Sequence, residues 1–172
     1  MANTYVNIAT TTLGSEQATV TFSSISQTYT DLVIKASLRV NQGGTFGGFQ
    51  IKAMDASTLY SWTRLWGGGN AGTSSNRTSS ASDWTQVNSE SVNANSSTAN
   101  TFSTHEFYFP SYAGSANKVA GLQNFTETNG LNAYISTYAA LVRSTSAITS
   151  ITFSSNGFVA GSSFYLYGIK NT

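Results

Sequence analysis

The sequence predicts an all-β protein, a two-sheet antiparallel β-sandwich with a jelly-roll-like arrangement of strands. Apolar and polar residues alternate along about ten segments, clusters of Gly, Asn, Ser and Asp separate these segments, and no segment combines a helical period with helix caps. The alternation is clearest over residues 31–40, where Leu32, Ile34, Ala36, Leu38 and Val40 share one face. Such a pattern is typical of a half-buried strand.

The same pattern places the other expected strands along the whole chain. They cover residues 4–9, 17–25, 48–54, 60–66, 102–109, 119–126, 133–143, 147–154 and 163–169. A chain of 172 residues is long enough to bury a core and short enough for one domain. We therefore expect a single β-sandwich domain over residues 1–172.

Residues 67–101 are an exception to this pattern. They form a long polar insertion in which Trp84, Val87 and Val92 are the only large or branched apolar side chains. Loops of this length are rare inside compact domains and are usually functional or disordered. Two interpretations stay open: a mobile surface insertion, or an arm that orders against a neighbouring subunit with Trp84 as its anchor.

Composition excludes two classes of partner. Charged residues make up 9% of the chain and the net charge is +1, whereas 66 of the 172 residues are Ser, Thr or Asn. Without a basic patch there is no electrostatic attraction for nucleic acid or for an acidic membrane surface. We expect neither partner, and a surface made of neutral polar groups suits contact with protein or glycan.

The chain has no cysteine and its first residues show no export signal. Met1–Tyr5 carries no basic stretch and no apolar segment follows it, and no window approaches a membrane span. We therefore expect synthesis in a reducing host cytoplasm and release on a particle at lysis.

Catalytic arrangements are poorly represented. His105 is the only imidazole, and alternation places it on the face of Phe107 and Phe109, opposite Glu106. A Ser-His-Asp triad is therefore not expected. Glu106 and Glu127 lie on neighbouring expected strands, and this pair leaves glycoside hydrolysis as a remote alternative.

Metal sites and cofactors are not expected either. One histidine and no thiolate cannot form a zinc site. Calcium could use Asp31, Asp55 and Asp83, but these acids do not form the closely spaced acidic run that collects charge around the ion. We predict a chain that is not an enzyme and holds no cofactor.

The candidate contact residues are aromatic. Over residues 60–66, Tyr60, Trp62, Arg64 and Trp66 fall on one face, and Arg64 is placed to stack on either Trp ring. If this face is buried, the Trp residues belong to the core; if it is exposed, they form a platform for a sugar or another subunit. In residues 164–169 both faces are apolar, so that strand is either internal or covered by a partner chain.

Two segments resemble virion proteins of tailed bacteriophages. The C-terminal run AITSITF, followed by NGFVAGSSFYLYGI, covers residues 147–153 and 156–169, and ISQTYTDLVI covers residues 25–34. They look like matching segments of capsid decoration (cement) proteins and of fibre or appendage domains. The resemblance implies a β-sandwich displayed on a phage particle, commonly as a homotrimer, and it implies no catalytic residue.

The first functional hypothesis is a capsid decoration protein that binds the major capsid protein lattice and stabilises the head. It would use residues 67–101 and the amino-terminal strand as contacts. The second is a receptor-binding or carbohydrate-binding module in which Trp62, Trp66 and Trp84 stack on a host glycan. Hydrolysis of cell-wall glycan through Glu106 and Glu127 is the third.

Overall fold

The computed structural model describes residues 4–54, 59–69, 72–86, 92–130 and 133–170. Within these ranges the chain forms strands and no helix, so the described part contains no helix able to span a membrane. The strands are β1 (Tyr5–Thr12), β2 (Gln17–Phe22), β3 (Asp31–Leu38), β4 (Phe46–Gly47), β5 (Phe49–Ala53), β6 (Tyr60–Gly68), β7 (Gly72–Ala81), β8 (Trp84–Gln86), β9 (Val92–Asn93), β10 (Ser103–Phe109), β11 (Lys118–Thr126), β12 (Tyr134–Val142), β13 (Ile151–Phe158) and β14 (Ser163–Ile169). Each of the ten segments expected from alternation overlaps one of them, although β1 and β13 run three and four residues beyond the expected ends at residues 9 and 154.

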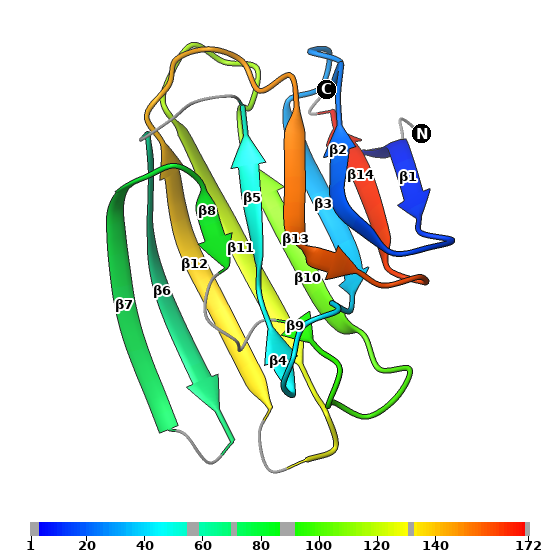
Figure 1. The fold of residues 1–172 in the computed structure, drawn as a ribbon. Helices are drawn as coiled ribbons and strands as arrows, with labels where there is room; N and C mark the ends of the chain where they lie inside the picture. Colours follow the sequence, from blue (N-terminus) through cyan, green and yellow to red (C-terminus); the bar gives the residue numbers. More distant parts are fainter. Residues whose placement is uncertain (1–3, 55–58, 70–71, 87–91, 131–132, 171–172) are drawn as a thin grey trace.

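Two antiparallel sheets form a sandwich. The larger has eight strands in the order β1-β14-β3-β10-β11-β12-β6-β7, and the smaller has four in the order β2-β13-β5-β8. The smaller sheet lies in front of the larger one in Figure 1, and a short β4-β9 pair closes one end. The all-β sandwich is confirmed, and the narrower jelly-roll arrangement stays a prediction.

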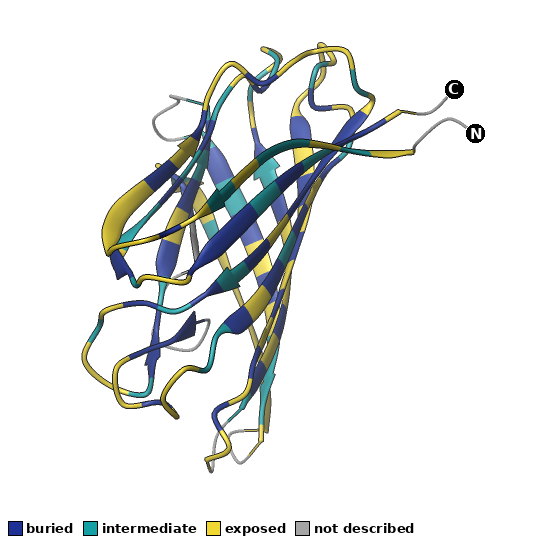
Figure 2. Ribbon diagram, turned by 90° about the vertical axis from the view of Figure 1, so that its right-hand side faces the viewer, coloured by how far each residue is buried: buried dark blue, intermediate teal, exposed yellow. Residues whose placement is uncertain are grey.

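The core lies between the two sheets and is rich in aromatic rings. Phe49 of β5 packs on rings of both sheets, with centroid separations of 6.1 Å to Phe107 and 6.2 Å to Phe153. Buried residues alternate with more exposed ones along β10, β11 and β12, and Figure 2 shows such banding by colour. Full burial of a Phe side chain contributes roughly 1.5–3 kcal/mol to folding, so the inner face of each sheet holds the sandwich together.

The described parts of residues 67–101 contribute strands to the sheets, which corrects the expectation of a free surface insertion or arm. β7 extends the larger sheet beside β6, with Arg64 opposite Asn76, and β8 joins the smaller sheet beside β5, with Ile51 opposite Trp84. Both strands therefore belong to this domain. Val87 lies outside the described residues.

One guanidinium organises the end of this stretch. Arg39, just after β3, donates from Nη1 to the carbonyl oxygens of Thr98 and Thr101 at 2.8 and 3.1 Å. Its Nη2 donates to the carbonyl oxygen of Ser97 at 3.2 Å. A planar group with five N–H donors is suited to gather carbonyls in this way, so a polar loop is ordered without an apolar core of its own.

The two segments that carry the phage resemblance lie side by side. β14 pairs with β3, and the amide of Thr30 donates to the carbonyl oxygen of Ile169 at 2.8 Å. The ring of Tyr29 lies directly on Gly168, where a Cβ would come within 2.3 Å of Tyr29 Cγ. Glycine is therefore required in the Leu-Tyr-Gly-Ile run because an aromatic ring of the early segment occupies the space of a side chain.

Candidate functional site

The aromatic face expected on β6 points into the sandwich. Trp62 is 8% exposed and Arg64 is 3% exposed, whereas Trp66 at the lower end of the strand is half-buried. Trp62 and Tyr138 meet edge to face at 5.9 Å, and Trp66 meets Tyr134 at 5.7 Å. This face was expected to be either part of the core or an exposed platform. Trp62 and Arg64 belong to the core, and Trp66 is only partly buried.

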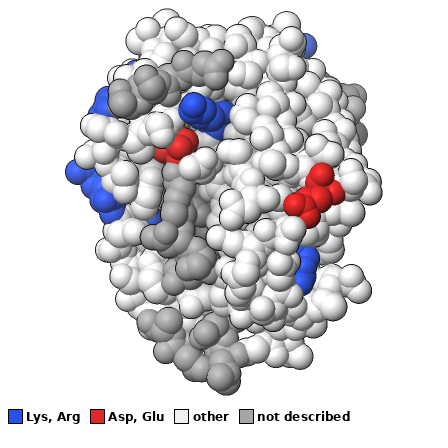
Figure 3. All heavy atoms as spheres, viewed as in Figure 1, with Lys and Arg blue, Asp and Glu red and all other residues white. Residues whose placement is uncertain are grey.

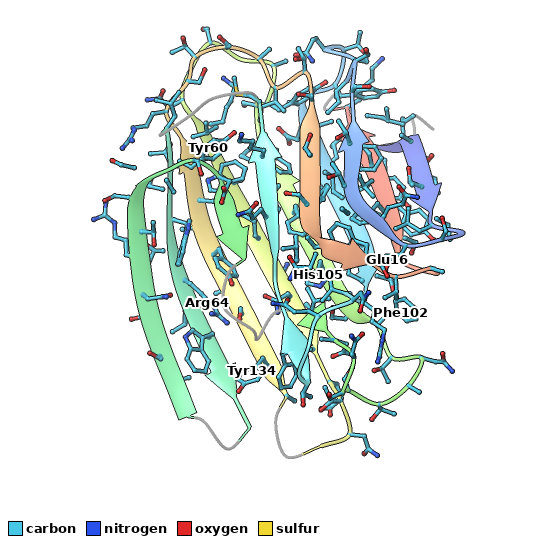
Figure 4. All side chains as sticks on the ribbon, viewed as in Figure 1. Glu16, Tyr60, Arg64, Phe102, His105 and Tyr134 are labelled. Carbon is cyan, nitrogen blue, oxygen red and sulfur yellow. The ribbon has the colours of Figure 1, made fainter. Side chains whose placement is uncertain are left out.

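Arg64 is held inside this aromatic layer. Its Nη2 and Nε donate to Ser136 Oγ at 3.0 and 3.3 Å, and its guanidinium lies over the rings of Trp66 and Tyr138 at 5.2 and 5.6 Å (Figure 4). Burial of a charge is costly unless other groups replace its hydration. The hydroxyl and the two ring faces help to replace it, so Arg64 stabilises the inner face of β6 and β12.

Trp84 is a core residue, which corrects its expected role as an anchor on a neighbouring subunit. It is 1% exposed, and its ring meets Tyr60 edge to face at 5.1 Å. Its Nε1 donates to the carbonyl oxygen of Leu141 at 3.2 Å, which ties the smaller sheet to the larger. This indole therefore has no surface to offer a partner or a glycan.

His105 is also structural. It is fully buried between Phe49 and Phe107, and its Nε2 lies 2.8 Å from Ser103 Oγ. Because Ser103 donates its hydroxyl proton to the carbonyl oxygen of Leu38, Oγ must accept from Nε2–H, which leaves Nδ1 unprotonated and unpartnered. Burial lowers the pKa of His105 to about 3, so the ring is neutral at pH 7.

The carboxylates considered for catalysis are engaged with other groups. Glu106 forms an ion pair with Lys35 at 2.9 Å on the outer face, and Glu127 Oε1 accepts the backbone amides of Thr128 and Asn129 at 2.9 and 2.8 Å. Among the described residues no three His, Asp or Glu side chains gather into a metal site. Asp55 lies outside these residues.

The candidate site is the opposite, outer face of the larger sheet. No described strand packs on this face, and five of its large apolar side chains are more than a third exposed. They are Tyr108, Leu65, Val119, Phe125 and Ile135. Tyr5, also exposed, borders them from the edge strand β1.

Charge is sparse on this face as on the smaller sheet. Lys35 and Glu106 are opposite one another in the register of β3 and β10, and this hydrogen-bonded pairing raises the pKa of Lys35. Figure 3 shows the smaller-sheet side of the molecule, where blue and red side chains are few on a largely uncharged surface. Contacts made by either face therefore depend mainly on packing and neutral hydrogen bonds.

One end of the outer face is bounded by β1 and its tyrosines. Tyr5 is 55% exposed and meets Tyr167 edge to face at 6.3 Å. Tyr108 donates its hydroxyl to Asp31 Oδ2 at 2.9 Å, and this hydrogen bond raises the pKa of Tyr108. β1 ends the strand order, so one of its two sides is unpaired within the described sheet; we call this side, with Tyr5, the β1 edge.

The other end contains a cavity of about 720 Å³, which we call the Gly67 hollow. Register places Thr73, Gly67, Ile135, Phe125 and Thr104 in one row across five strands. Gly67 leaves the floor low, whereas Ile135 and Phe125 stand beside it with 62% and 45% exposure. The remaining lining residues are Gly68, Gly69, Gly72, Phe102, Thr126, Glu127, Ala133 and Tyr134.

Sequence reasoning missed these outer-face residues. The signal was present in β11, where Val119 and Phe125 alternate with inward Ala120, Leu122 and Asn124, so both faces carry large apolar groups. In β11 the exposed Phe125 follows the buried Asn124. The more apolar face of a strand is therefore not always the one that faces the core.

Comparison with known proteins identifies no relative. No protein-family description matches the chain, and no curated protein or solved structure is similar to it. The phage resemblance therefore rests on the two segments of the sequence that carry it.

Proposed function

We propose that this chain is a bacteriophage capsid decoration (cement) protein that binds the outside of the major capsid lattice and stabilises the head. The observation that carries the proposal is the open, nearly uncharged outer face that ends at the β1 edge. The resemblance of residues 25–34 and 147–169 to phage virion proteins supports the class of particle. Its location would then be the virion surface, after synthesis in the host cytoplasm.

The β1 edge is suited to strand addition. Its eight residues, Tyr5–Thr12, include no charged side chain and no proline. Exposed edges in natural proteins are usually protected by charge, proline, a β-bulge or a covering element, and β1 has only a shift of register between Asn7 and Ala9. An edge without charge or proline offers backbone donors and acceptors to an extended segment of a capsid subunit, and the exposed Tyr5 ring adds an apolar anchor.

The low charge of the chain favours contact with a protein capsid over contact with a highly charged polymer such as nucleic acid. The chain carries eight Lys and Arg against seven Asp and Glu, and Lys35 and Glu106 neutralise one another on the outer face. Binding through neutral groups is little affected by salt. A homotrimer would multiply this modest contact by avidity, which is the assembly that the resemblance implies.

The alternative of a receptor-binding or carbohydrate-binding module loses the residues first assigned to it. Trp62 and Trp84 are buried, and Arg64 is occupied within the core. Only Trp66 keeps partial exposure. Capsid docking is favoured over a glycan platform built on these three Trp residues.

Co-sedimentation with particles that lack this protein tests the proposal. The double variant Tyr5→Lys, Thr10→Lys puts two protective charges on the β1 edge, and we expect at least about tenfold weaker particle binding. The matched control Ser75→Lys, Ser79→Lys adds the same charges to β7 at the opposite edge and should bind like the unmodified chain. Unchanged binding by a folded β1-edge variant would overturn the proposed contact.

Salt provides a second readout. We expect particle affinity to change by less than about threefold between about 0.05 and 0.5 M salt, since few charges contribute. A much steeper dependence would point to an electrostatic contact and contradict docking through the β1 edge.

A further inference from the structure

We propose that the Gly67 hollow binds a neutral carbohydrate, a function separate from capsid docking at the β1 edge. The two places lie on different parts of the larger sheet: β1 ends it on one side, and the hollow spans strands from β10 to β7, toward the opposite side (Figure 1). One surface could therefore hold the particle while the other remains accessible.

The shape of the hollow suits a small ligand. Its volume of about 720 Å³ falls within the roughly 300–1,000 Å³ common for small-molecule pockets. The floor is low because Gly67 has no side chain, although the backbone leaves room for one. A Cβ built on Gly67 meets only Thr73 Cγ2, at 3.4 Å. The hollow is therefore open space that a larger residue would fill without moving the sheet.

An aromatic side chain stands in this space without a ring partner. Phe125 is 45% exposed and takes part in none of the aromatic pairs found among the described residues. Phe102 lines the same hollow and packs its ring edge near Gly161. An exposed ring face suits stacking on the apolar face of a sugar ring, which also needs hydrogen bonds around its rim.

Those hydrogen-bonding groups are present and one of them is fixed in place. Thr73 and Thr104 bring hydroxyl groups to the lining, and Glu127 brings a carboxylate. Two backbone amides hold Glu127 Oε1, so the direction of the carboxylate is set before a ligand arrives. A pre-oriented acceptor reduces the entropy lost when the hydroxyl groups of a sugar bind.

Charge decides between classes of glycan. Among the described residues that line the hollow, Glu127 alone is charged, and it is negative. An anionic sugar or a phosphate would be repelled and would find no Lys or Arg to pair with. A purely apolar peptide side chain would offer no hydrogen-bond donor to the Glu127 carboxylate. A neutral oligosaccharide satisfies the ring, the hydroxyls and the carboxylate together.

An array of neutral, sialylated and sulfated oligosaccharides, probed with the full chain, tests the proposal. We expect binding to neutral glycans alone. The strongest neutral glycan on the array is then used in calorimetric titrations of the variants. Phe125→Ala should weaken it by at least about tenfold, the effect of losing one well-packed aromatic contact.

Gly67→Leu should abolish binding by filling the hollow. Glu127→Gln should weaken binding less than Phe125→Ala, because the amide keeps one acceptor oxygen.

Matched controls lie on the same face outside the hollow. Val119→Ala shortens another exposed side chain of β11, and Gly121→Leu adds a side chain where a Cβ meets nothing within 4 Å. Both should bind glycan like the unmodified chain. Folding of every variant is checked by circular dichroism and thermal unfolding, so that loss of binding is not loss of structure.

The outcomes separate this proposal from capsid docking. Loss of glycan binding by Phe125→Ala with particle binding retained supports two separate sites. No binding to any neutral glycan, preferential binding of anionic glycans, or equal effects of Phe125→Ala and Val119→Ala would each overturn the carbohydrate site. None of those results would alter the particle-binding test at the β1 edge.

Discussion

The two faces of the larger sheet contain similar kinds of residue but use them differently. The inner face carries Trp62, Arg64 and His105, each enclosed by rings or hydroxyl groups. The outer face carries Phe125 and Ile135, which are apolar but open to solvent. Alternation of residue types along a strand shows that the strand has two different faces. Which of the two faces becomes part of the core depends on where the second sheet packs. The chemically conspicuous side chains here stabilise the fold, and the plainer ones form the candidate contact surface.

The sharpest test of this contrast replaces one large apolar residue of the core, Trp84 of the smaller sheet, and one on the outer face, Leu65. Trp84→Ala removes a fully enclosed indole and its hydrogen bond to Leu141, and we expect the free energy of unfolding to fall by about 3–5 kcal/mol. Leu65→Ala on the outer face should cost less than about 0.5 kcal/mol, because that side chain is 55% exposed. Urea unfolding measures both. A Trp84→Ala protein of unchanged stability would mean that this indole is not core.

Acid should destabilise the protein through its inner face. The folded pKa of His105 is about 3 and the ordinary value is 6.5, so between these values the unfolded chain binds a proton that the folded chain lacks. Stability is therefore lost as pH falls from about 6.5 toward about 3, by up to about 1.4 kcal/mol per pH unit.

Urea titrations between about pH 7 and 4.5 measure this slope. His105→Gln keeps an Nε2–H donor for Ser103 but does not titrate, and its stability should depend less on pH in this window. Identical slopes for the two proteins would show that His105 is already accessible to protons.

The contact between the two phage-like segments can be broken and restored. Gly168→Ala places a methyl group against the Tyr29 ring, and we expect a loss of about 2 kcal/mol in the free energy of unfolding. In a protein that already carries Tyr29→Ala, the further change Gly168→Ala should alter the free energy of unfolding very little. Gly121→Ala on the outer face, which has open space around it, is the control and should change little. Additive effects of Tyr29→Ala and Gly168→Ala would argue against the contact.

The smallest effect is expected at the outer ion pair. Lys35→Met removes the partner of Glu106, and since both side chains are partly exposed the loss should be less than about 0.5 kcal/mol. High salt should erase the difference between Lys35→Met and the unmodified chain. A loss above about 2 kcal/mol would mean that the outer face is covered and the pair is desolvated.

Sequence patterns were sufficient for the sandwich but not for its edges. The ten alternating segments were found because one side of each strand is buried. β7, by contrast, is Gly-Thr-Ser-Ser-Asn-Arg-Thr-Ser-Ser-Ala, an edge strand with almost no buried side chain, so it has no apolar period to detect. Trp84 was misjudged for a related reason: its neighbours in sequence are polar, and its enclosing partners Tyr60 and Phe109 are distant along the chain.

The candidate site was harder to predict than the fold. The Gly67 hollow depends on register across five strands, and alternation within a single strand cannot reveal which residues stand in one row. The buried polar residues of the inner face add to this difficulty, because Asn124 and Ser136 interrupt the apolar side of β11 and β12. Only the pairing of the two sheets removes this ambiguity.

The position of β14 in the larger sheet determines when β1 can pair during synthesis of the chain. β14 lies between β1 and β3, so the first strand has no partner until more than 150 residues have followed it. A nascent chain that extends only to β13 must leave β1 unattached, and the edge proposed for docking does not yet exist. If the β1 edge docks on a capsid as we propose, incomplete chains would not compete for positions on the particle, because β14 must be in place before β1 joins the sheet.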